Sequence, residues 1–396
     1  MKKYIIILLL IIFLLFLVLI KDNKSDNRAG KVSNNSNPEK RAIFLSYIEL
    51  QKYVKGNSEE DAKKNIDIII DNIYDFNFNV LILQVRSFSD AIYESSIFPW
   101  SSSVSSSEGI NPGYDVLKYF IEKAHEKKIE LHAWINPYRI RNNTDTDSIS
   151  SENKAYEWLN TNNVKVCENG IFYNPASKDV QKLVIDGVVE LLNNYDVDGI
   201  HFDDYFYPSC DIDSENYEEF SKKSENISLD EYRLLMVNNM VKKVHKITKK
   251  RKKVFGISPE GNIENNYSSN YADVYEWGKS DKYVDYLMPQ IYYGFYNEVK
   301  PFNDVVNEWN DLVKGSNVKI IPALAFYKTG KIDEYAKSGA REWVENDNII
   351  MKQILISRNI NNYNGFAIFR YDSMFGDSNN QTTLNEKENL KKIMKK

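Results

Sequence analysis

The sequence predicts an α/β protein, a (β/α)8 TIM-type barrel preceded by an N-terminal membrane anchor and a polar tether. From Arg41 onward, short apolar runs alternate with longer segments of helical period, and this alternation occurs eight times without a sequence repeat. An open doubly wound sheet usually stops at about five to seven strands, whereas eight rounds over roughly 355 residues are typical of a barrel. We therefore expect one large domain over residues 41–396.

The N-terminal segment, residues 1–20, predicts a membrane anchor. Two lysines precede an unbroken apolar run over residues 4–20, which is at the short limit for a membrane span and also compatible with a signal peptide. No small-residue cleavage site follows, so we favour an uncleaved anchor over a cleaved signal. Residues 21–40, rich in Asn, Ser and Lys, then predict a flexible tether. Both alternatives place the body of the chain outside the cytoplasm.

The expected strands and helices follow in order. Strands are predicted over residues 42–47, 80–85, 129–135, 197–202, 254–258, 286–291, 318–325 and 365–370. Between them, residues 61–76, 180–195 and 229–248 place apolar side chains at helical spacing. Ser58 with Asp61, and Ser228 with Glu231, have the spacing of a capping box at two of these helix starts.

The composition excludes several classes of protein. The chain is 42% hydrophobic and 27% charged, with two Cys, which excludes a disordered chain and a disulfide scaffold. The net charge is −5, and because residues 1–40 are basic, the expected domain is more acidic than the whole chain. An acidic body argues against nucleic acid as a partner. Cys167 and Cys210 could pair outside the cell, and two free thiols are equally compatible with the sequence.

The period-2 alternation within the strands gives the inward side chains. In the second strand Leu81, Leu83 and Val85 form an outer apolar face, so Gln84 and Arg86 are expected to point inward. The same alternation turns the following side chains inward near the strand ends: His132, Trp134, Asn136, His201, Asp203, Gln290 and Tyr292. Barrel enzymes carry their sites at this end, so polar and aromatic groups gather where chemistry is expected.

Two adjacent carboxylates are the strongest single signal. The segment DVDGIHFDDYFYP, residues 196–208, ends an apolar strand in Asp203 and Asp204, which are expected to be catalytic. Glycoside cleavage needs one protonated carboxyl group and a second charge that stabilises or captures an oxocarbenium-like centre. The alternative is that one aspartate caps the next turn and pairs with a base such as Arg86; alternation turns Asp204 away from the barrel.

Five segments carry a resemblance to a known family. They are LILQVRSFSDAIYESSIFPWSSSV (81–104), PGYDVLKYFIEKAHEKKIELHAWINPYRI (112–140), residues 196–208, GISPEGNIENNY (256–267) and VDYLMPQIYYGF (284–295). The chain resembles the glycosyl-hydrolase-like 10 family from about Arg41 to Ser373. This resemblance implies an exported bacterial (β/α)8 protein linked to hydrolysis of peptidoglycan glycan. It also implies pocket positions for Arg86, Asp90, Asn136, Tyr138, Asp203, Asp204, Gln290 and Tyr292.

The expected substrate groove combines aromatic faces with polar groups. Aromatic rings can stack on sugar rings, and the residues expected to do so are Trp100, Trp134, Tyr138, Tyr205, Tyr207 and Tyr292. Arg86, Asn136 and Gln290 are expected to bond hydroxyl and N-acetyl groups. Glu260, after the fifth strand, is a candidate substrate contact. By analogy with chitinase-type barrels, Tyr292 and Gln290 are candidates to orient a substrate N-acetyl group.

Together, these expectations predict a glycoside hydrolase that acts on bacterial cell-wall glycan. Its expected partners are this polysaccharide and the membrane. The competing interpretation is a carbohydrate-binding barrel with weak or no activity. A polysaccharide deacetylase would need a metal triad, and no HxH, HExxH or CxxC spacing appears, so no metal or cofactor is expected. His132 and His201 are interpreted as core residues. The sequence leaves open the linkage cleaved, the stereochemical course and the oligomeric state.

Overall fold

A computed structural model describes residues 38–223, 227–378 and 380–394 of the chain. The expected anchor, and the expected tether up to residue 37, lie outside the described residues. Within the described ranges, no helix has both the length and the apolar character needed to cross a bilayer. The described residues from Glu39 onward belong to one compact unit, Glu39–Lys396.

A curled parallel sheet forms the centre of this unit, which confirms the predicted α/β class. Its strands run in the order β10-β9-β8-β7-β3-β2-β1-β12-β11, and every pair is parallel. The strands are β1 (Lys40–Leu45), β2 (Val80–Arg86), β3 (Glu130–Ile135), β7 (Gly199–Phe202), β8 (Val254–Ile257), β9 (Tyr286–Leu287), β10 (Lys319–Ile320), β11 (Ala323–Ala325) and β12 (Gly365–Phe369). Each of the eight expected runs therefore contains strand.

The seventh expected run is divided into two short strands, β10 and β11. Ile321 and Pro322 separate them, and proline has no N–H group to donate within a sheet. Strand β10 pairs with β9, while β11 pairs with β12. Strands β10 and β11 are thus the two ends of the strand order, and one segment joins both edges of the sheet. A further bridge joins Gln290 to Ala323.

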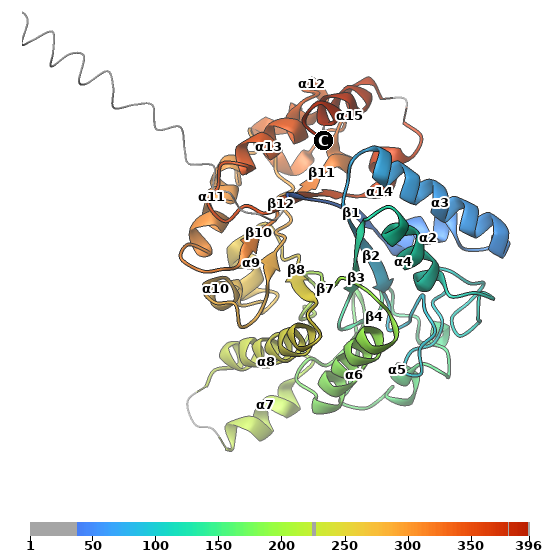
Figure 1. Cartoon of the computed structure of the whole chain (residues 1–396). Helices are drawn as coiled ribbons and strands as arrows, with labels where there is room; N and C mark the ends of the chain where they lie inside the picture. The colour runs from blue at the N-terminus through green and yellow to red at the C-terminus, as the bar shows by residue number, and fades with distance from the viewer. Residues whose placement is uncertain (1–37, 224–226, 379, 395–396) are drawn as a thin grey trace, which may run out of the picture. The chain divides into compact units, whose positions relative to one another are not determined.

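Helices surround the strands (Figure 1). The longer ones are α2 (Tyr47–Tyr53), α3 (Glu59–Asp75), α4 (Val116–Glu126), α6 (Lys178–Asn194), α7 (Ser214–Ser221), α8 (Leu229–Lys250), α11 (Phe302–Leu312), α13 (Ile349–Ser357) and α15 (Gln381–Ile393). The shorter ones are α5 (Lys154–Glu157), α9 (Ile263–Ser268), α10 (Val274–Lys279), α12 (Glu342–Glu345) and α14 (Tyr371–Phe375). The three expected helices correspond to α3, α6 and α8. Ser228 and Glu231 form the capping box of α8, and the Ser58 hydroxyl accepts a hydrogen bond from the Asp61 N–H at α3.

Two hydrophobic cores lie on the two faces of the sheet. Leu81, Leu83 and Val85 belong to the core between the sheet and the helices, while Val80 and Ile82 belong to the inner core. The predicted alternation of β2 is therefore confirmed over residues 80–85. The inner face is closed by large rings such as Tyr286, Trp134 and Phe44.

Tyr286 fills the inner core because β8 makes room for it. A Cβ atom at Gly256 would lie 2.0 Å from the Tyr286 ring, so only glycine fits at that position. The Tyr286 hydroxyl lies 2.9 Å from Nδ1 of His132 and 3.0 Å from Nδ1 of His201. Both histidines are buried, and each has a partner inside the barrel.

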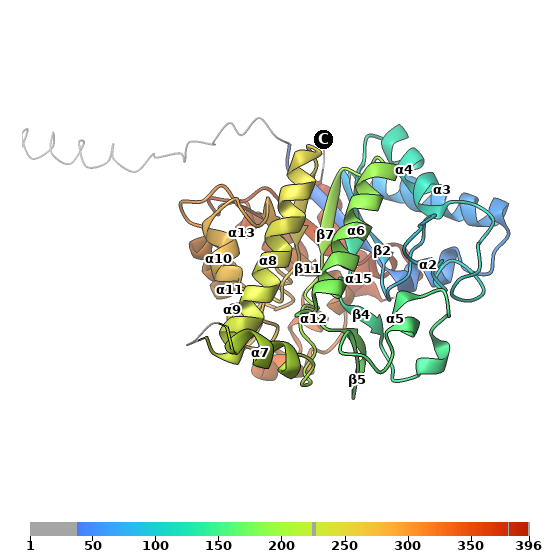
Figure 2. The same cartoon turned by 90° about the horizontal axis from the view of Figure 1, so that it is seen from below.

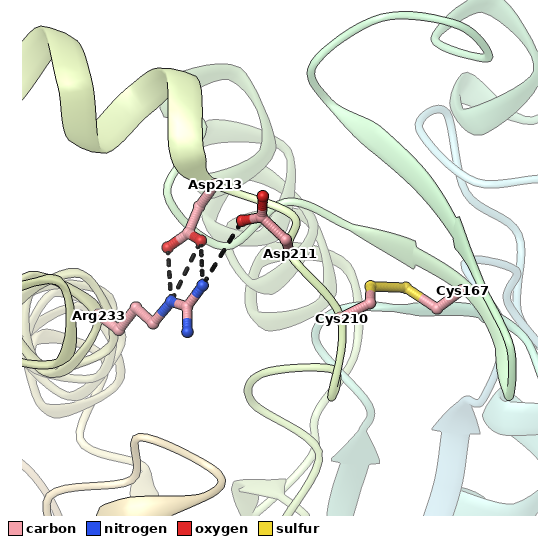
Figure 3. Close-up of a disulfide and its surroundings, with 5 residues drawn as sticks. All are labelled: Cys167, Cys210, Asp211, Asp213 and Arg233. Carbon is pink, nitrogen blue, oxygen red and sulfur yellow. Dashed lines mark hydrogen bonds and ion pairs between the residues drawn. A yellow bond between two sulfur atoms is a disulfide. The ribbon is translucent and has the colours of Figure 1, made fainter.

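A small antiparallel sheet, absent from the sequence prediction, follows β3. Its strands β4 (Arg139–Arg141), β5 (Val164–Cys167) and β6 (Gly170–Tyr173) have the order β4-β6-β5. Figure 2 shows β5 at the same end of the molecule as α7 and α12, both of which follow the carboxyl ends of central strands. A disulfide joins Cys167 at the end of β5 to Cys210 after β7, which settles the alternative that the sequence left open (Figure 3).

Candidate active site

A cavity of about 230 Å³ opens at the carboxyl ends of the central strands. Side chains from or just after β1, β2, β3, β7, β8, β9 and β12 contribute to its wall. The residues that line it are Phe44, Ser46, Tyr47, Ile48, Gln84, Trp134, Arg139, Asp203, Asp204, Tyr205, Ser258, Gln290, Tyr292 and Phe369. Six of the expected site residues are among them: Trp134, Asp203, Asp204, Tyr205, Gln290 and Tyr292.

Asp203 is held rigidly at the inner wall of the cavity. It directly follows β7, and it is buried. Its Oδ2 atom accepts a hydrogen bond from the Trp134 indole N–H at 3.0 Å, and its Oδ1 atom accepts one from the Tyr205 backbone N–H at 3.3 Å. The carboxylate thus has a donor for each oxygen, and both donors favour its ionised form.

Asp204 lies beside Asp203 and keeps partial contact with solvent. Burial and repulsion from Asp203 raise the pKa of Asp204 to about 7, although a hydrogen bond from Gln290 opposes this rise. Burial also raises the pKa of Asp203, to about 6, but attraction to Arg139 and the hydrogen bond from Trp134 oppose it. The two carboxyl groups repel each other when both are ionised, and because Asp203 has the two hydrogen-bond donors, its environment favours the charge on Asp203 and the proton on Asp204.

Arg139 is a cavity residue that sequence reasoning missed. Its guanidinium carbon lies 4.6 Å from the ring centre of Tyr205 and 4.8 Å from that of Phe88. The Asn136 side chain accepts hydrogen bonds from the N–H groups of Tyr138 and Arg139, which turns the chain into β4. Arg139 is the first residue of a sheet that the sequence did not predict, so strand alternation could not indicate the direction of its side chain. The only sequence feature that pointed to Arg139 is its position within residues 112–140, which resemble the family.

The structure turns Arg86 away from the cavity. Alternation predicts an inward Arg86, but the register with β3 shifts between Gln84 and Arg86. This irregularity reverses the side-chain direction, because strand side chains alternate with a period of two. The Arg86 guanidinium carbon instead lies 3.8 Å from the Phe98 ring centre, and a Cβ atom at Gly187 of α6 would come within 2.2 Å of Arg86 Nη1.

Other expected residues also lie outside the cavity wall. Asp90 is buried in the connection after β2, where it accepts a hydrogen bond from the Phe88 N–H at 3.1 Å and burial raises its pKa. Trp100 forms a bridge with Ala91 in the same connection. Asn136 is buried and supports the turn just described, and Tyr138 is packed in the outer core.

Tyr207 and Glu260 have structural partners. The Tyr207 ring is 7% exposed, and it packs edge-on against Tyr271. The expected open stacking surface at Tyr207 is therefore a packed one. The Glu260 carboxylate accepts hydrogen bonds from the side-chain amides of Asn270, at 3.0 Å, and Asn265, at 3.3 Å. Glu260 still contributes to the repulsion that raises the pKa of Asp204.

The described residues contain no group of three or more His, Cys, Asp or Glu placed to hold a metal ion. The chemistry that this cavity can perform with its own side chains is proton transfer and charge stabilisation by the aspartate pair, next to the cationic Arg139.

Comparison with known proteins gives the family. The model of the family described as glycosyl hydrolase-like 10 matches residues 39–344, which is most of the chain. The chain belongs to this family. Among its relatives, glycosyl hydrolase YngK of Bacillus subtilis is 29% identical over 353 residues, covering 82% of this chain and 66% of YngK. Glycosyl hydrolase DigH of Escherichia coli K12 is 27% identical over 337 residues, covering 76% of this chain and 74% of DigH.

Solved structures of glycoside hydrolases have the same fold. The PgaB (BpsB) glycoside hydrolase domain from Bordetella bronchiseptica superposes with a TM-score of 0.53 at 12% identity, covering 88% of this chain and 99% of that domain. The catalytic domain of β-amylase from Paenibacillus polymyxa gives a TM-score of 0.55 at 9% identity, covering 90% and 99%. This member of the glycosyl hydrolase-like 10 family therefore has a TIM-like fold. YngK is longer, and the chain spans just under two thirds of it.

We expect Asp204→Asn to stabilise the protein at alkaline pH. The folded state raises the pKa of Asp204, so folding favours its protonated form, and this contribution to stability is lost as pH rises through about 7. Asparagine cannot ionise. The free energy of unfolding of the variant should be close to that of the wild type near pH 4. The difference should grow as pH rises, and the variant should exceed the wild type by up to ~4 kcal/mol at pH 8.

Urea denaturation at pH 4, 6 and 8 measures this difference. Asp281→Asn, at an exposed aspartate, is the matched control and should change the free energy of unfolding little at any pH. A difference between Asp204→Asn and wild type that does not grow between pH 4 and pH 8 would contradict the raised pKa.

Proposed function

We propose that this protein is a glycoside hydrolase that cleaves the glycan of the bacterial cell wall at the Asp203–Asp204 pair. The observation that carries the proposal is two adjacent carboxyl groups in one cavity, of which Asp203 accepts hydrogen bonds from Trp134 and the Tyr205 N–H. These donors favour the ionised form of Asp203, and repulsion from it favours a proton on Asp204. That division of roles is what glycoside cleavage requires. Membership of the family and the fold of its structural neighbours support the same reaction class.

In the proposed reaction, protonated Asp204 donates its proton to the glycosidic oxygen as the bond from that oxygen to the anomeric carbon breaks. Ionised Asp203 stabilises the positive charge that develops at the anomeric carbon. Water then supplies a hydroxyl group to that carbon, and its remaining proton returns to Asp204. Trp134 and the Tyr205 N–H keep the Asp203 oxygens in place throughout.

The choice of substrate rests on the family resemblance and on the aromatic wall of the cavity. Trp134, Tyr205 and Tyr292 line it, and such rings stack on the apolar faces of sugars. Gln290 donates a hydrogen bond to the Ser258 carbonyl at 3.0 Å, which fixes its side chain beside Asp204. We assign to Gln290 and Tyr292 the contact with substrate hydroxyl or N-acetyl groups.

The test is incubation of the purified full-length protein with intact and with peptide-free cell-wall glycan, followed by mass spectrometry of the new chain ends. We expect cleavage, with a bell-shaped pH dependence of kcat/KM whose flanks lie near pH 6 and 7, because one carboxyl must be ionised and one protonated. Retention on the glycan without new ends would favour the carbohydrate-binding alternative.

We also propose an extracytoplasmic location with the chain anchored in the membrane. The apolar run over residues 4–20 supports an anchor, and the Cys167–Cys210 disulfide is typical of proteins outside the cytoplasm. We expect the protein in the membrane fraction of its cells. A mature form in the medium, with an N-terminus between residues 22 and 31, would replace the anchor with a cleaved signal.

A further inference from the structure

Two loops at the carboxyl end of the sheet carry large apolar side chains that face solvent. One follows β9 and contains Tyr296, 70% exposed, and Val299, 59% exposed. The other follows β11 and contains Ile332, 57% exposed, and Tyr335, 89% exposed. Scattered apolar residues are normal on a surface, but four on two joined loops form a candidate binding site. We call this set the tyrosine platform.

The two loops are built as one unit. The Glu298 N–H donates to the Ala336 carbonyl at 3.3 Å, and the Ser338 hydroxyl donates to the Glu298 carboxylate at 2.9 Å. At Gly339 the main chains lie so close that a Cβ atom would stand 2.0 Å from the Tyr296 carbonyl oxygen. Tyr296 and Tyr335 therefore belong to neighbouring, mutually bonded segments.

A buried carboxylate fixes the backbone that carries Tyr296. Glu342 of α12 is 5% exposed, and its two oxygens accept hydrogen bonds from the N–H groups of Phe295, at 2.8 Å, and Tyr296, at 2.9 Å. Charge-assisted bonds of this kind hold a loop in one conformation. The platform is therefore ordered before any ligand binds, which lowers the entropy cost of binding.

The platform is connected to the wall of the cavity. The Lys328 ammonium group donates to the Tyr292 carbonyl at 2.8 Å and to the Asp333 carboxylate at 2.6 Å. Tyr292 lines the cavity, and its ring packs edge-on against Tyr327 at 5.8 Å between ring centres. Asp333 lies between Ile332 and Tyr335 in sequence, so Lys328 joins the second loop to the cavity residue Tyr292.

The size of the cavity indicates what the platform would bind. Pockets for small molecules measure about 300–1,000 Å³, and this cavity has about 230 Å³, which suits about one sugar ring. A polymeric substrate must place its other rings outside. We propose that Tyr296 and Tyr335 bind the sugar rings of the same glycan strand that extend beyond the cavity. This inference rests on the proposed function and adds a second binding region to it.

The surface fits a glycan better than it fits a lipid or a second protein. Four side chains cover far less than the ~800 Å² per partner of a stable protein interface. The loops carry both signs of charge, with Glu298 and Glu334 beside Lys331 and Lys337, so they do not form the cluster of basic residues that binds anionic lipid. Hydroxyl-rich sugar rings accept both the aromatic faces and the polar surroundings.

The test compares long peptide-free cell-wall glycan strands with a tetrasaccharide from the same polymer. For the double variant Tyr296→Ala/Tyr335→Ala we expect KM on long strands to rise at least tenfold with kcat nearly unchanged, and no change on the tetrasaccharide. Tyr74→Ala is the matched control, because Tyr74 is 38% exposed near the end of α3, at the opposite end of the sheet. It should leave both substrates unaffected.

An unchanged KM on long strands, or an equal rise in KM on both substrates, would contradict the proposal that the tyrosine platform binds the extended glycan. Electrophoresis through gels containing the long glycan separates this result from failure of the proposed activity. If the wild type cleaves neither substrate but is retarded in the gel, and the double variant is not, then the platform stands and the catalytic proposal falls. If the double variant sediments differently from the wild type but acts on and binds the long glycan as the wild type does, the two tyrosines mediate contact between copies of the chain. That result would overturn the inference.

Discussion

Asp203→Asn is expected to lower the rate of glycan hydrolysis by about 10³-fold or more, a loss of about 4 kcal/mol in transition-state stabilisation. Asparagine has nearly the size of aspartate, but it carries no charge to stabilise the anomeric carbon. It also replaces one of two acceptor oxygens with an amide nitrogen, so it can accept from Trp134 or from the Tyr205 N–H, and not from both. The effect should appear in kcat, measured by release of new glycan ends.

Two comparison variants rank the neighbouring acids. Asp204→Asn should also lower kcat strongly, because it removes the proposed proton donor. Glu260→Gln should change the rate far less, since the Glu260 carboxylate is engaged by Asn265 and Asn270 and does not line the cavity. Circular dichroism establishes that each variant is folded. Full activity in folded Asp203→Asn protein would refute its assignment, and full activity in all three would move the site elsewhere.

The repeating pattern of the fold could be predicted because it is local. Each of the eight expected strand runs contains strand, and α3, α6 and α8 begin within two residues of their expected starts. Burial on both faces of a parallel strand produces a continuous apolar run, and caps mark helix starts. The division of the seventh run at Pro322, and the small sheet after β3, depend on contacts between distant segments, which no local pattern contains.

The candidate site could be predicted as far as the strands remain regular. Trp134 and Asp203 line the cavity as alternation requires, and so do Gln290 and Tyr292 beyond the short strand β9. Alternation fails at Arg86 because the register shifts in one residue step. It carries no information about Arg139, which reaches the cavity from β4.

Sequence pattern also fails to distinguish two neighbouring loop tyrosines, of which only one lines the cavity. Tyr205 and Tyr207 differ by two positions, so the sequence treats them alike. In the structure Tyr205 is 49% exposed at the cavity, whereas Tyr207 packs against Tyr271 and lies 5.6 Å from the Arg233 guanidinium. What separates them is the partner on α8, more than 20 residues away in sequence. The aromatic groove expected from the sequence is therefore shorter on this side.

Loss of the disulfide is expected to have the second large effect, this time on stability. Cys167 and Cys210 are 43 residues apart, and closing a loop of that length restricts the unfolded chain by an entropy worth about 4 kcal/mol. We expect the double variant Cys167→Ser/Cys210→Ser to lose up to about that much free energy of unfolding. Urea denaturation of both proteins, with and without reductant, measures it.

We expect the same double variant to keep most of its kcat although its free energy of unfolding falls, because the segment after β7 has a second attachment. The guanidinium of Arg233 on α8 donates to Asp213, with Nη2 at 2.6 Å from Oδ1 and Nε at 3.0 Å from Oδ2 (Figure 3). Asp213 is fully buried, so this ion pair persists when the disulfide is absent. Asp203 also keeps its bonds to Trp134 and Tyr205, and we expect kcat at 25 °C to fall by less than tenfold.

Reductant is the control for the stability measurement. It should lower the denaturation midpoint of the wild type to that of the double variant and leave the midpoint of the variant unchanged. Equal midpoints for wild type and variant without reductant would show that the disulfide does not stabilise the fold.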